Sequence, residues 1–316
     1  MPTHTKFKGV ENIGDSLPSD QIQTNLKFFL DWAFLEIGAF SNVSISQSGV
    51  YGGDYSRLRL SEDPNYEQGK VWEGFRSDWV WESGIEYAHQ PIRVSGVYID
   101  NVYFPANSGT YHIDYPLGRV VFNNPISPSS VVKCAFSHRY CQVVTEDVPW
   151  WREIQKNSYR IDSQDFLNYG SGSWSVLGQS RIQLPAIVIE VVPNTRRKSF
   201  EIGNLTQTVS QKVLMHVIAE TPWERRQLHD ILTTQEEKRL IMFDKNAVFS
   251  SGVYPLNEYG SPSPSGKMYP DLIKPNANGG YGWRQLRLTS CESVEQKVLS
   301  PLYFCTVETT CEVELP

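Results

Sequence analysis

Two cysteines and a histidine near the middle of the chain could together bind a zinc ion. Cys134, His138 and Cys141 lie within one short stretch, and thiolate and imidazole groups are common zinc ligands. The sequence around them has the character of strands, in which successive side chains alternate between two faces. This alternation places Cys134 and His138 on one face and Cys141 on the other, so we expect free thiols and no metal site.

A group of tryptophans with carboxylates beside it could bind or cleave sugars. Trp72, Trp79 and Trp81 lie close together, with Asp78 and Glu82 next to them. In a strand, Trp79 and Trp81 would face the same way, and an aromatic face can stack on sugar rings or hold a protein partner. A glycoside hydrolase also needs two carboxyl groups about 5 to 10 Å apart across a cleft. A carbohydrate-binding module and a glycoside hydrolase are therefore the alternatives to core or subunit packing of these tryptophans.

The sequence lacks the common catalytic and cofactor-binding motifs. HExxH, GxSxG, a Walker phosphate loop, a dinucleotide fingerprint and a CxxC pair are all missing. The formal net charge is −6, and the short basic run Arg196-Arg197-Lys198 predicts a solvated loop rather than a nucleic-acid site. We therefore expect a protein that is not an enzyme and that binds no cofactor or metal.

Composition indicates a folded chain made in a reducing compartment. Of the 316 residues, 40% are hydrophobic and 20% are charged, which is typical of a folded protein long enough for two domains. No stretch approaches the roughly 18 apolar residues of a membrane-spanning helix. The five cysteines are dispersed and odd in number, as in proteins whose thiols stay reduced. We expect assembly in a cytoplasm, with no membrane partner.

The N-terminal part of the chain predicts one helix. Apolar residues recur every three or four positions from residue 22 to residue 37, and Gly38 ends the pattern. Asp20 and Gln23 resemble a capping box. The apolar face is wide, so we expect the helix to pack against a sheet or against another subunit.

Short strands are predicted after this helix. The segments with strand character are residues 42–60, 92–99, 102–104 and 109–143. The last of them predicts three strands in a meander, because apolar residues alternate on either side of the turn Pro116-Leu117-Gly118.

The C-terminal third predicts a sheet with one packed helix. Strands are predicted at residues 184–192, 209–219, 240–243, 283–288 and 302–313. Thr221-Pro222-Trp223-Glu224 is a strong helix start, with Thr as N-cap and Pro at the first helical position, and the helix extends to about Glu237. The fold class is therefore α+β and β-rich, with a helix on one face of the C-terminal sheet.

These elements suggest two domains. The predicted division is an N-terminal helix and β-rich domain at residues 1–144, a linker at residues 145–180, and a C-terminal α+β domain at residues 181–316. The linker contains aromatic residues separated by polar ones and the flexible run Gly170-Ser171-Gly172-Ser173.

Two segments resemble structural proteins of tailed-bacteriophage virions. In the meander, Tyr-His-Ile-Asp-Tyr-x-x-Gly-Arg-Val-Val-Phe-x-x-Pro-Ile is similar to a β-module of neck and tail components. Further on, LPAIVIEVV, KSFEIGN and TPWERRQLHDILTTQEEKRLIMFD look like a domain of neck and tail-completion proteins, including tail terminators. In that domain a sheet and a helix build one subunit of a ring. A tail terminator is usually a smaller, single-domain protein, so the N-terminal β-rich domain is a departure from the pattern.

The resemblance implies a structural virion protein at the neck. It would form a ring, with a hexamer as the expected order, that joins the head or portal side to the tail. DNA would pass through a mildly acidic channel without sequence-specific binding, and the partners would be other copies and other neck, portal-side or tail proteins. The candidate subunit-interface residues are Trp79, Trp81, Tyr254, Tyr259, Tyr269 and Trp223.

Residues 247–282 predict an unusually long loop. The segment is rich in Gly, Pro, Ser and Asn, and Tyr254, Tyr259, Tyr269 and Tyr281 recur along it. Aromatic side chains on a polar segment can anchor it to a partner. We expect an arm that lies on a neighbouring subunit, with a plain surface loop as the alternative.

Overall fold

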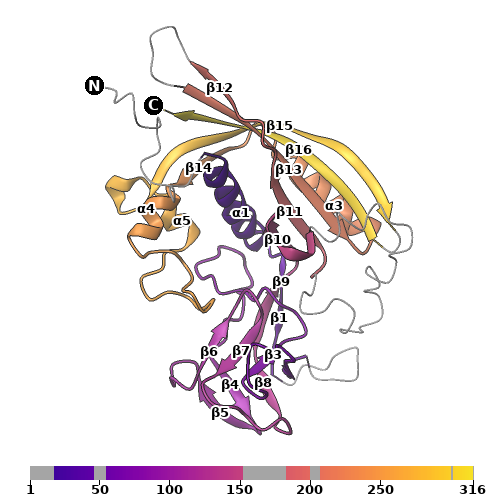
Figure 1. Ribbon diagram of the computed structural model, residues 1–316, viewed down its shortest axis with the longest axis vertical. Coiled ribbons are helices and arrows are strands. Elements are labelled where there is room, and N and C mark those ends of the chain that lie inside the picture. The colour runs from indigo at the N-terminus through magenta and orange to yellow at the C-terminus, as the bar shows by residue number, and fades with distance from the viewer. Residues whose placement is uncertain (1–17, 46–54, 152–182, 200–206, 300–301, 316) are drawn as a thin grey trace.

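The computed structural model describes residues 18–45, 55–151, 183–199, 207–299 and 302–315 (Figure 1). The fold is α+β and rich in strands, as the sequence predicts. No helix in the described ranges is long and apolar enough to cross a membrane. The helical segments with both ends described are α1 (Pro18–Glu36), α3 (Pro222–Thr233), α4 (Lys245–Ser250), α5 (Tyr269–Leu272) and the 3₁₀ turn η2 (Asn276–Asn278), and residues 149–151 are helical as well.

A large sheet forms the body of the molecule. Its strand order is β10-β11-β13-β16-β15-β14, with β12 pairing with β13 beside the end of β11. The pair β10–β11 is parallel, and the other pairs in this sheet are antiparallel. The strands are β10 (Gln142–Thr145), β11 (Ala186–Val191), β12 (Arg196–Ser199), β13 (Gln207–Ala219), β14 (Arg239–Phe243), β15 (Gly282–Leu299) and β16 (Leu302–Leu315).

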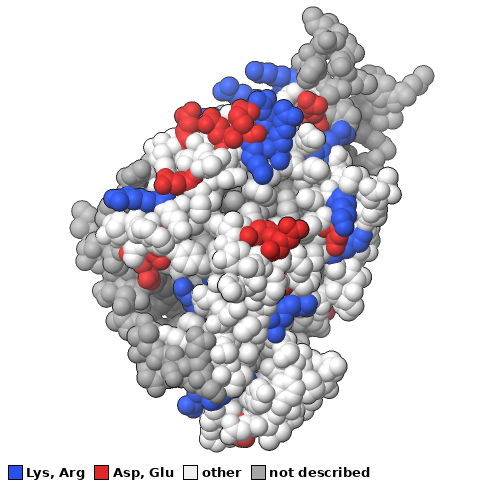
Figure 2. Space-filling view, turned by 180° about the vertical axis from the view of Figure 1, so that it is seen from behind, with Lys and Arg blue, Asp and Glu red and all other residues white. Residues whose placement is uncertain are grey.

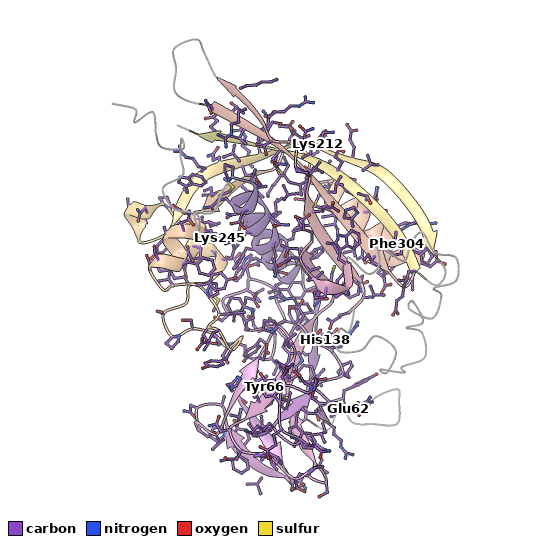
Figure 3. All side chains as sticks on the ribbon, viewed as in Figure 1. Glu62, Tyr66, His138, Lys212, Lys245 and Phe304 are labelled. Carbon is purple, nitrogen blue, oxygen red and sulfur yellow. The ribbon has the colours of Figure 1, made fainter. Side chains whose placement is uncertain are left out.

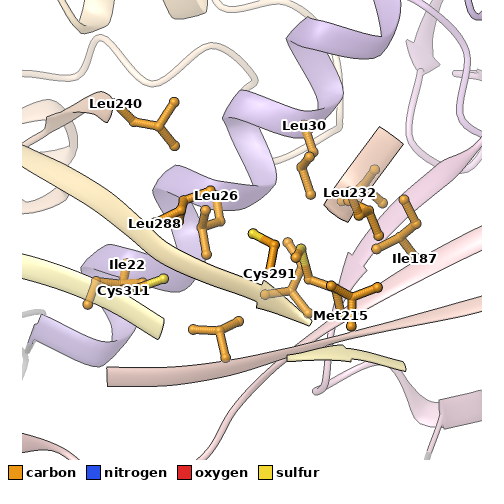
Figure 4. Close-up of a cluster of buried hydrophobic side chains, with 14 of the residues drawn as sticks. Ile22, Leu26, Leu30, Ile187, Met215, Leu232, Leu240, Leu288, Cys291 and Cys311 are labelled. Atoms are coloured by element: carbon orange, nitrogen blue, oxygen red, sulfur yellow. The ribbon is translucent and has the colours of Figure 1, made fainter. Parts of the chain in front are cut away.

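Helices α1 and α3 pack on one face of this sheet and enclose its main core (Figure 4). Ile22, Leu26 and Leu30 lie on one stripe of α1, because side chains three or four apart share a helix face. They meet alternate residues of the strands, including Val213 and Met215. The helix predicted after residue 221 is confirmed, since Thr221 and Glu224 form a complete capping box at the start of α3.

A smaller β-rich lobe lies at the opposite end of the molecule from β12 (Figure 1). It contains the sheets β2-β3-β7-β6 and β5-β4-β8 and the pair β1–β9. Trp79 and Phe136 stack at the centre of its core, with ring centroids 4.3 Å apart. The strands are β1 (Phe40–Val43), β2 (Arg59–Leu60), β3 (Val71–Glu73), β4 (Gly96–Ile99), β5 (Val102–Pro105), β6 (Tyr111–Asp114), β7 (Arg119–Phe122), β8 (Val132–Cys134) and β9 (Phe136–Arg139).

Three local expectations need correction. The predicted meander does not continue beyond its hairpin, because β8 pairs with β4 and not with β7. The basic run at residues 196–198 lies in strand β12 and is not a loop. Helix α1 begins at Pro18, so Asp20 is within its first turn and is not a cap. Asp20 pairs instead with Lys245 Nζ, at 2.7 Å.

The packing also crosses the predicted domain boundary. Helix α1, assigned by sequence to the N-terminal domain, packs on the large sheet, and β10 at residues 142–145 is a strand of that sheet. Burial of the wide apolar face of α1 requires a partner of matching size, which the large sheet offers. Most of the predicted linker, residues 152–180, lies outside the described residues.

The prediction of a long loop at residues 247–282 is also corrected by the structure, while the predicted arm on a neighbouring subunit stays a prediction. The segment contains part of α4, all of α5 and η2, and packs against the chain's own α1. Tyr269 and Leu272 are buried in a cluster with Trp32 and Leu35 of α1. Tyr254 and Tyr281 also belong to this cluster, so aromatic side chains supply much of the core of the segment.

Two tyrosines of this segment provide a matched test of its packing. Tyr269 is 8% exposed and Tyr259 is 55% exposed. We expect Tyr269→Ala to lower the free energy of unfolding by about 3 kcal/mol, since it removes a buried ring. Tyr259→Ala should change it by less than about 1 kcal/mol. Urea unfolding of both variants measures the difference, and equal effects would contradict the described packing.

Candidate functional site

The structure separates the six predicted interface residues into buried and accessible ones. Trp79, Trp81 and Tyr269 are at most 8% exposed, so they cannot serve as subunit anchors in this conformation. Tyr254 is half-buried and stacks on Phe249, with ring centroids 4.5 Å apart. Only Trp223 and Tyr259 of the six are well exposed, at 63% and 55%.

The tryptophans do not form the exposed face that sugar binding requires. Trp72, Trp79 and Trp81 are all buried. The indole N–H of Trp72 donates to Gly69 O at 3.0 Å, and that of Trp79 donates to Arg76 O at 2.8 Å. The N–H groups of these two indoles are thus hydrogen-bonded to the backbone inside the lobe. This arrangement removes the basis for a carbohydrate-binding module, because no indole of the three offers its flat face to solvent.

Asp78 and Glu82 meet at a single buried guanidinium. Arg139 Nε lies 3.2 Å from Asp78 Oδ1, and Arg139 Nη2 pairs with Glu82 Oε1. Arg139 Nη1 also donates to the carbonyl oxygen of Asp31 in α1, at 3.4 Å. We call Asp31, Asp78, Glu82 and Arg139 the Arg139 cluster. Because the two carboxylates share one cation, they are not arranged as the opposed acid and nucleophile of a glycosidase.

The Arg139 cluster lies where the lobe, helix α1 and the large sheet meet. The neighbouring His138 marks this level in Figure 3. The N–H of Arg139 donates to Asp78 O at 3.1 Å, and Gln183 Nε2, just before β11, donates to Arg139 O at 3.3 Å. Asp78 has a φ of +55°, which is unfavourable for a residue with a Cβ. The surrounding contacts hold this backbone so that its carboxylate faces Arg139.

Burial raises the pKa values of two carboxyl groups in the Arg139 cluster. Burial raises the pKa of Asp31 to about 7, although Arg139 and Lys27 act in the opposite direction. Burial also raises the pKa of Asp78. For Arg139, the nearby carboxylates outweigh burial and raise its pKa, so it stays charged. Asp31 in the cluster is therefore still partly protonated near neutral pH.

The three potential zinc ligands lie in different environments. Cys134 is buried in the core of the lobe and Cys141 in the core under the large sheet. Burial lowers the pKa of His138 to about 4 and raises the pKa of the Cys134 thiol. Cys134 and Cys141 thus belong to separate cores, which agrees with the opposite faces inferred from the sequence.

A polar network covers part of the sheet face opposite to α1 and α3. Lys212 Nζ lies 2.5 Å from Glu308 Oε1. Glu190 Oε2 lies 3.0 Å from His216 Nε2, and Thr306 Oγ1 lies 3.0 Å from His216 Nδ1. The sequence does not indicate this network, because its members belong to three strands and are paired only by the register of the sheet.

Comparison with family models and with curated proteins finds no match for this sequence.

Loss of the guanidinium should destabilise the protein strongly. We expect Arg139→Met to lower the free energy of unfolding by about 3 to 5 kcal/mol, because it leaves buried carboxylates without a cation. Arg287→Met is the control, since Arg287 pairs with the exposed Glu237, and it should cost far less than Arg139→Met. Urea unfolding gives both values. A triple variant that adds Asp78→Asn and Glu82→Gln should recover part of the loss, and no recovery would contradict charge as the cause.

The stored proton should make stability depend on pH. Asp31 keeps its proton up to about pH 7 in the folded chain, whereas the ordinary pKa of an aspartate side chain is 3.8. Its contribution to stability is therefore complete below about pH 4 and is lost as the pH rises to about 7. We expect the free energy of unfolding of Asp31→Asn, relative to the parent, to rise over this range and then level off. The control is Asp230→Asn, whose side chain is 78% exposed. A difference for Asp31→Asn that does not vary with pH would contradict the raised pKa.

Proposed function

We propose that this chain is a structural protein of a tailed-phage virion and forms a ring at the neck that joins the head or portal side to the tail. The proposal rests on the resemblance of residues 109–143 and about 180–245 to neck and tail proteins. The second segment supplies β11, β12, β13, α3 and β14. It is thus a sheet with a packed helix, which is the arrangement that the resemblance implies.

The observation that supports this role best is the length of the central strands of the large sheet. Strands β13, β15 and β16 contain 13, 18 and 14 residues, whereas an average strand has about 5 or 6. Strands this long support an extended surface. Part of its face opposite to α1 and α3 carries ion pairs such as Lys212–Glu308, while Trp151 and Ile218 belong to an apolar cluster on another part of that face. A polar face with paired charges is suited to contact water or a passing polyanion without holding it.

Ring formation requires two different surfaces on each subunit that fit each other. Trp223 is the strongest candidate for one of them, because it projects from the first turn of α3 and is 63% exposed. Exposed tryptophan is costly in a monomer, and tryptophan is enriched among the residues that dominate binding energy. Tyr259, 55% exposed in the segment beside α4, is the second candidate.

Native mass spectrometry of the purified chain and a reconstruction of the particle neck test the proposal together. We expect the chain in the neck at a ring stoichiometry, and we expect Trp223→Ala to weaken assembly at least tenfold while leaving thermal unfolding unchanged. Leu117→Ala, which removes a side chain 53% exposed on the lobe, is the control. Particles that lack the chain would refute the proposed function, and a normal ring of Trp223→Ala would refute the interface.

A further inference from the structure

The lobe is joined to the body of the molecule through a two-stranded ribbon. The chain enters the lobe along β1 and leaves it along β9, and these strands pair with each other from Phe40↔Arg139 to Val43↔Phe136. Val43 and Phe136 lie in the core of the lobe, whereas Phe40 packs against the buried cluster beside α1. The ribbon therefore spans the junction, and Arg139 is the last residue of β9 on the side of the body.

The Arg139 cluster brings charged groups of the lobe and of the body together. On the face seen in Figure 2, charged side chains crowd over the body and few lie on the lobe. The ion pairs that Arg119 makes with two aspartates lie within the lobe. In the Arg139 cluster, by contrast, Asp78 and Glu82 belong to the segment between β3 and β4, and Asp31 belongs to α1. Charge in this cluster therefore acts directly across the junction.

One guanidinium cannot balance the three carboxyl groups of the cluster if all of them are ionised. Asp78 and Glu82 already pair with Arg139 through its Nε and Nη2 atoms. A buried charge without a partner is costly, so the third carboxyl group, that of Asp31, is more stable with a proton. Burial accordingly raises the pKa of Asp31 to about 7. When the pH rises further, this proton leaves and the cluster gains a negative charge.

The other titratable groups around Asp31 do not offset this change. Lys27, one turn earlier on α1, lowers the pKa of Asp31, but burial outweighs it. Cys141, just before β10, and Tyr254, in the segment after α4, are both influenced by Asp31, and burial raises the pKa of each, so they remain neutral near pH 7. Burial also raises the pKa of Asp78, but the ion pair with Arg139 favours its charged form. Loss of the proton from Asp31 therefore changes the charge balance at the junction.

We infer that the Arg139 cluster is a pH-sensitive latch between the lobe and the body, closed while Asp31 carries a proton and loosened when Asp31 is ionised. In the loosened state the carboxylates of Asp31, Asp78 and Glu82 repel one another across the junction. The unfavourable backbone of Asp78, with φ at +55°, then favours movement of this residue away from Arg139. Neutral hydrogen bonds elsewhere between the lobe and the body persist, so the lobe becomes mobile at the ribbon without detaching. This inference does not depend on the proposed virion role.

Distances between paired spin labels on the lobe and on the body test the latch in the folded protein. Because all five native cysteines are buried, labels can be placed selectively at Leu117→Cys on the lobe and Asp230→Cys on α3. We expect one narrow distance distribution below about pH 6 and a broader one above about pH 8, because Asp31 ionises between these values. Adding Asp31→Asn should keep the distribution narrow at both pH values. A parent distribution that does not change with pH, or equal broadening with Asp31→Asn, would overturn the inference.

A second variant tests whether charge at Asp31 is the cause. Lys27 lowers the pKa of Asp31, so Lys27→Met should move the midpoint of the broadening to higher pH. Arg226→Met removes a cation from an exposed position of α3 and should leave the midpoint where it is. A midpoint that Lys27→Met does not move, or that both variants move equally, would show that the lobe does not respond to the charge of Asp31.

Discussion

The packing of helix α1 is the constraint on which the rest of the structure depends. One stripe of the helix, including Leu26 and Leu30, lies on the large sheet. A second stripe, including Trp32 and Leu35, contacts the segment after β14. Between them, Asn25 bonds to both the N–H and the C=O of Phe243 at the end of β14. Because each fully buried apolar side chain contributes about 1.5 to 3 kcal/mol, a single helix supports the sheet and the segment that follows it.

The same helix brings polar chemistry to the junction with the lobe. Asp31 lies on α1 and reaches the Arg139 cluster, so the position of the lobe is tied to the helix by buried charge as well as by apolar contact. Buried ion pairs add little net stability, but they are costly to break, and they can favour one arrangement over its alternatives. The main effect of the Arg139 cluster is therefore to fix the position of the lobe relative to the large sheet, because other arrangements would break its buried ion pairs.

Local signals in the sequence predicted local structure well. The capping box at Thr221 and Glu224 marked the start of α3, and the alternation in residues 209–219 marked β13, because both signals involve neighbours in the chain. Contacts between distant residues were missed. Arg139 and Asp78 are 61 positions apart, and no local pattern distinguishes a carboxylate in contact with a guanidinium from one in water. The tryptophan pattern was equally ambiguous, since alternation gives a shared face without indicating whether solvent or protein covers it.

The order of the strands has a consequence for how the protein is made. Strand β16 is the last strand in the sequence, yet it lies inside the large sheet between β13 and β15. During synthesis, β13 leaves the ribosome without its partner β16, because the 82 residues from 220 to 301 must be made before β16 begins. The large sheet can then close only after β16 has been made, so a product truncated before β16 lacks the strand that joins β13 to β15. Such late, long-range pairing is also slow, and the exposed edge of β13 in the waiting chain is a natural client for a chaperone.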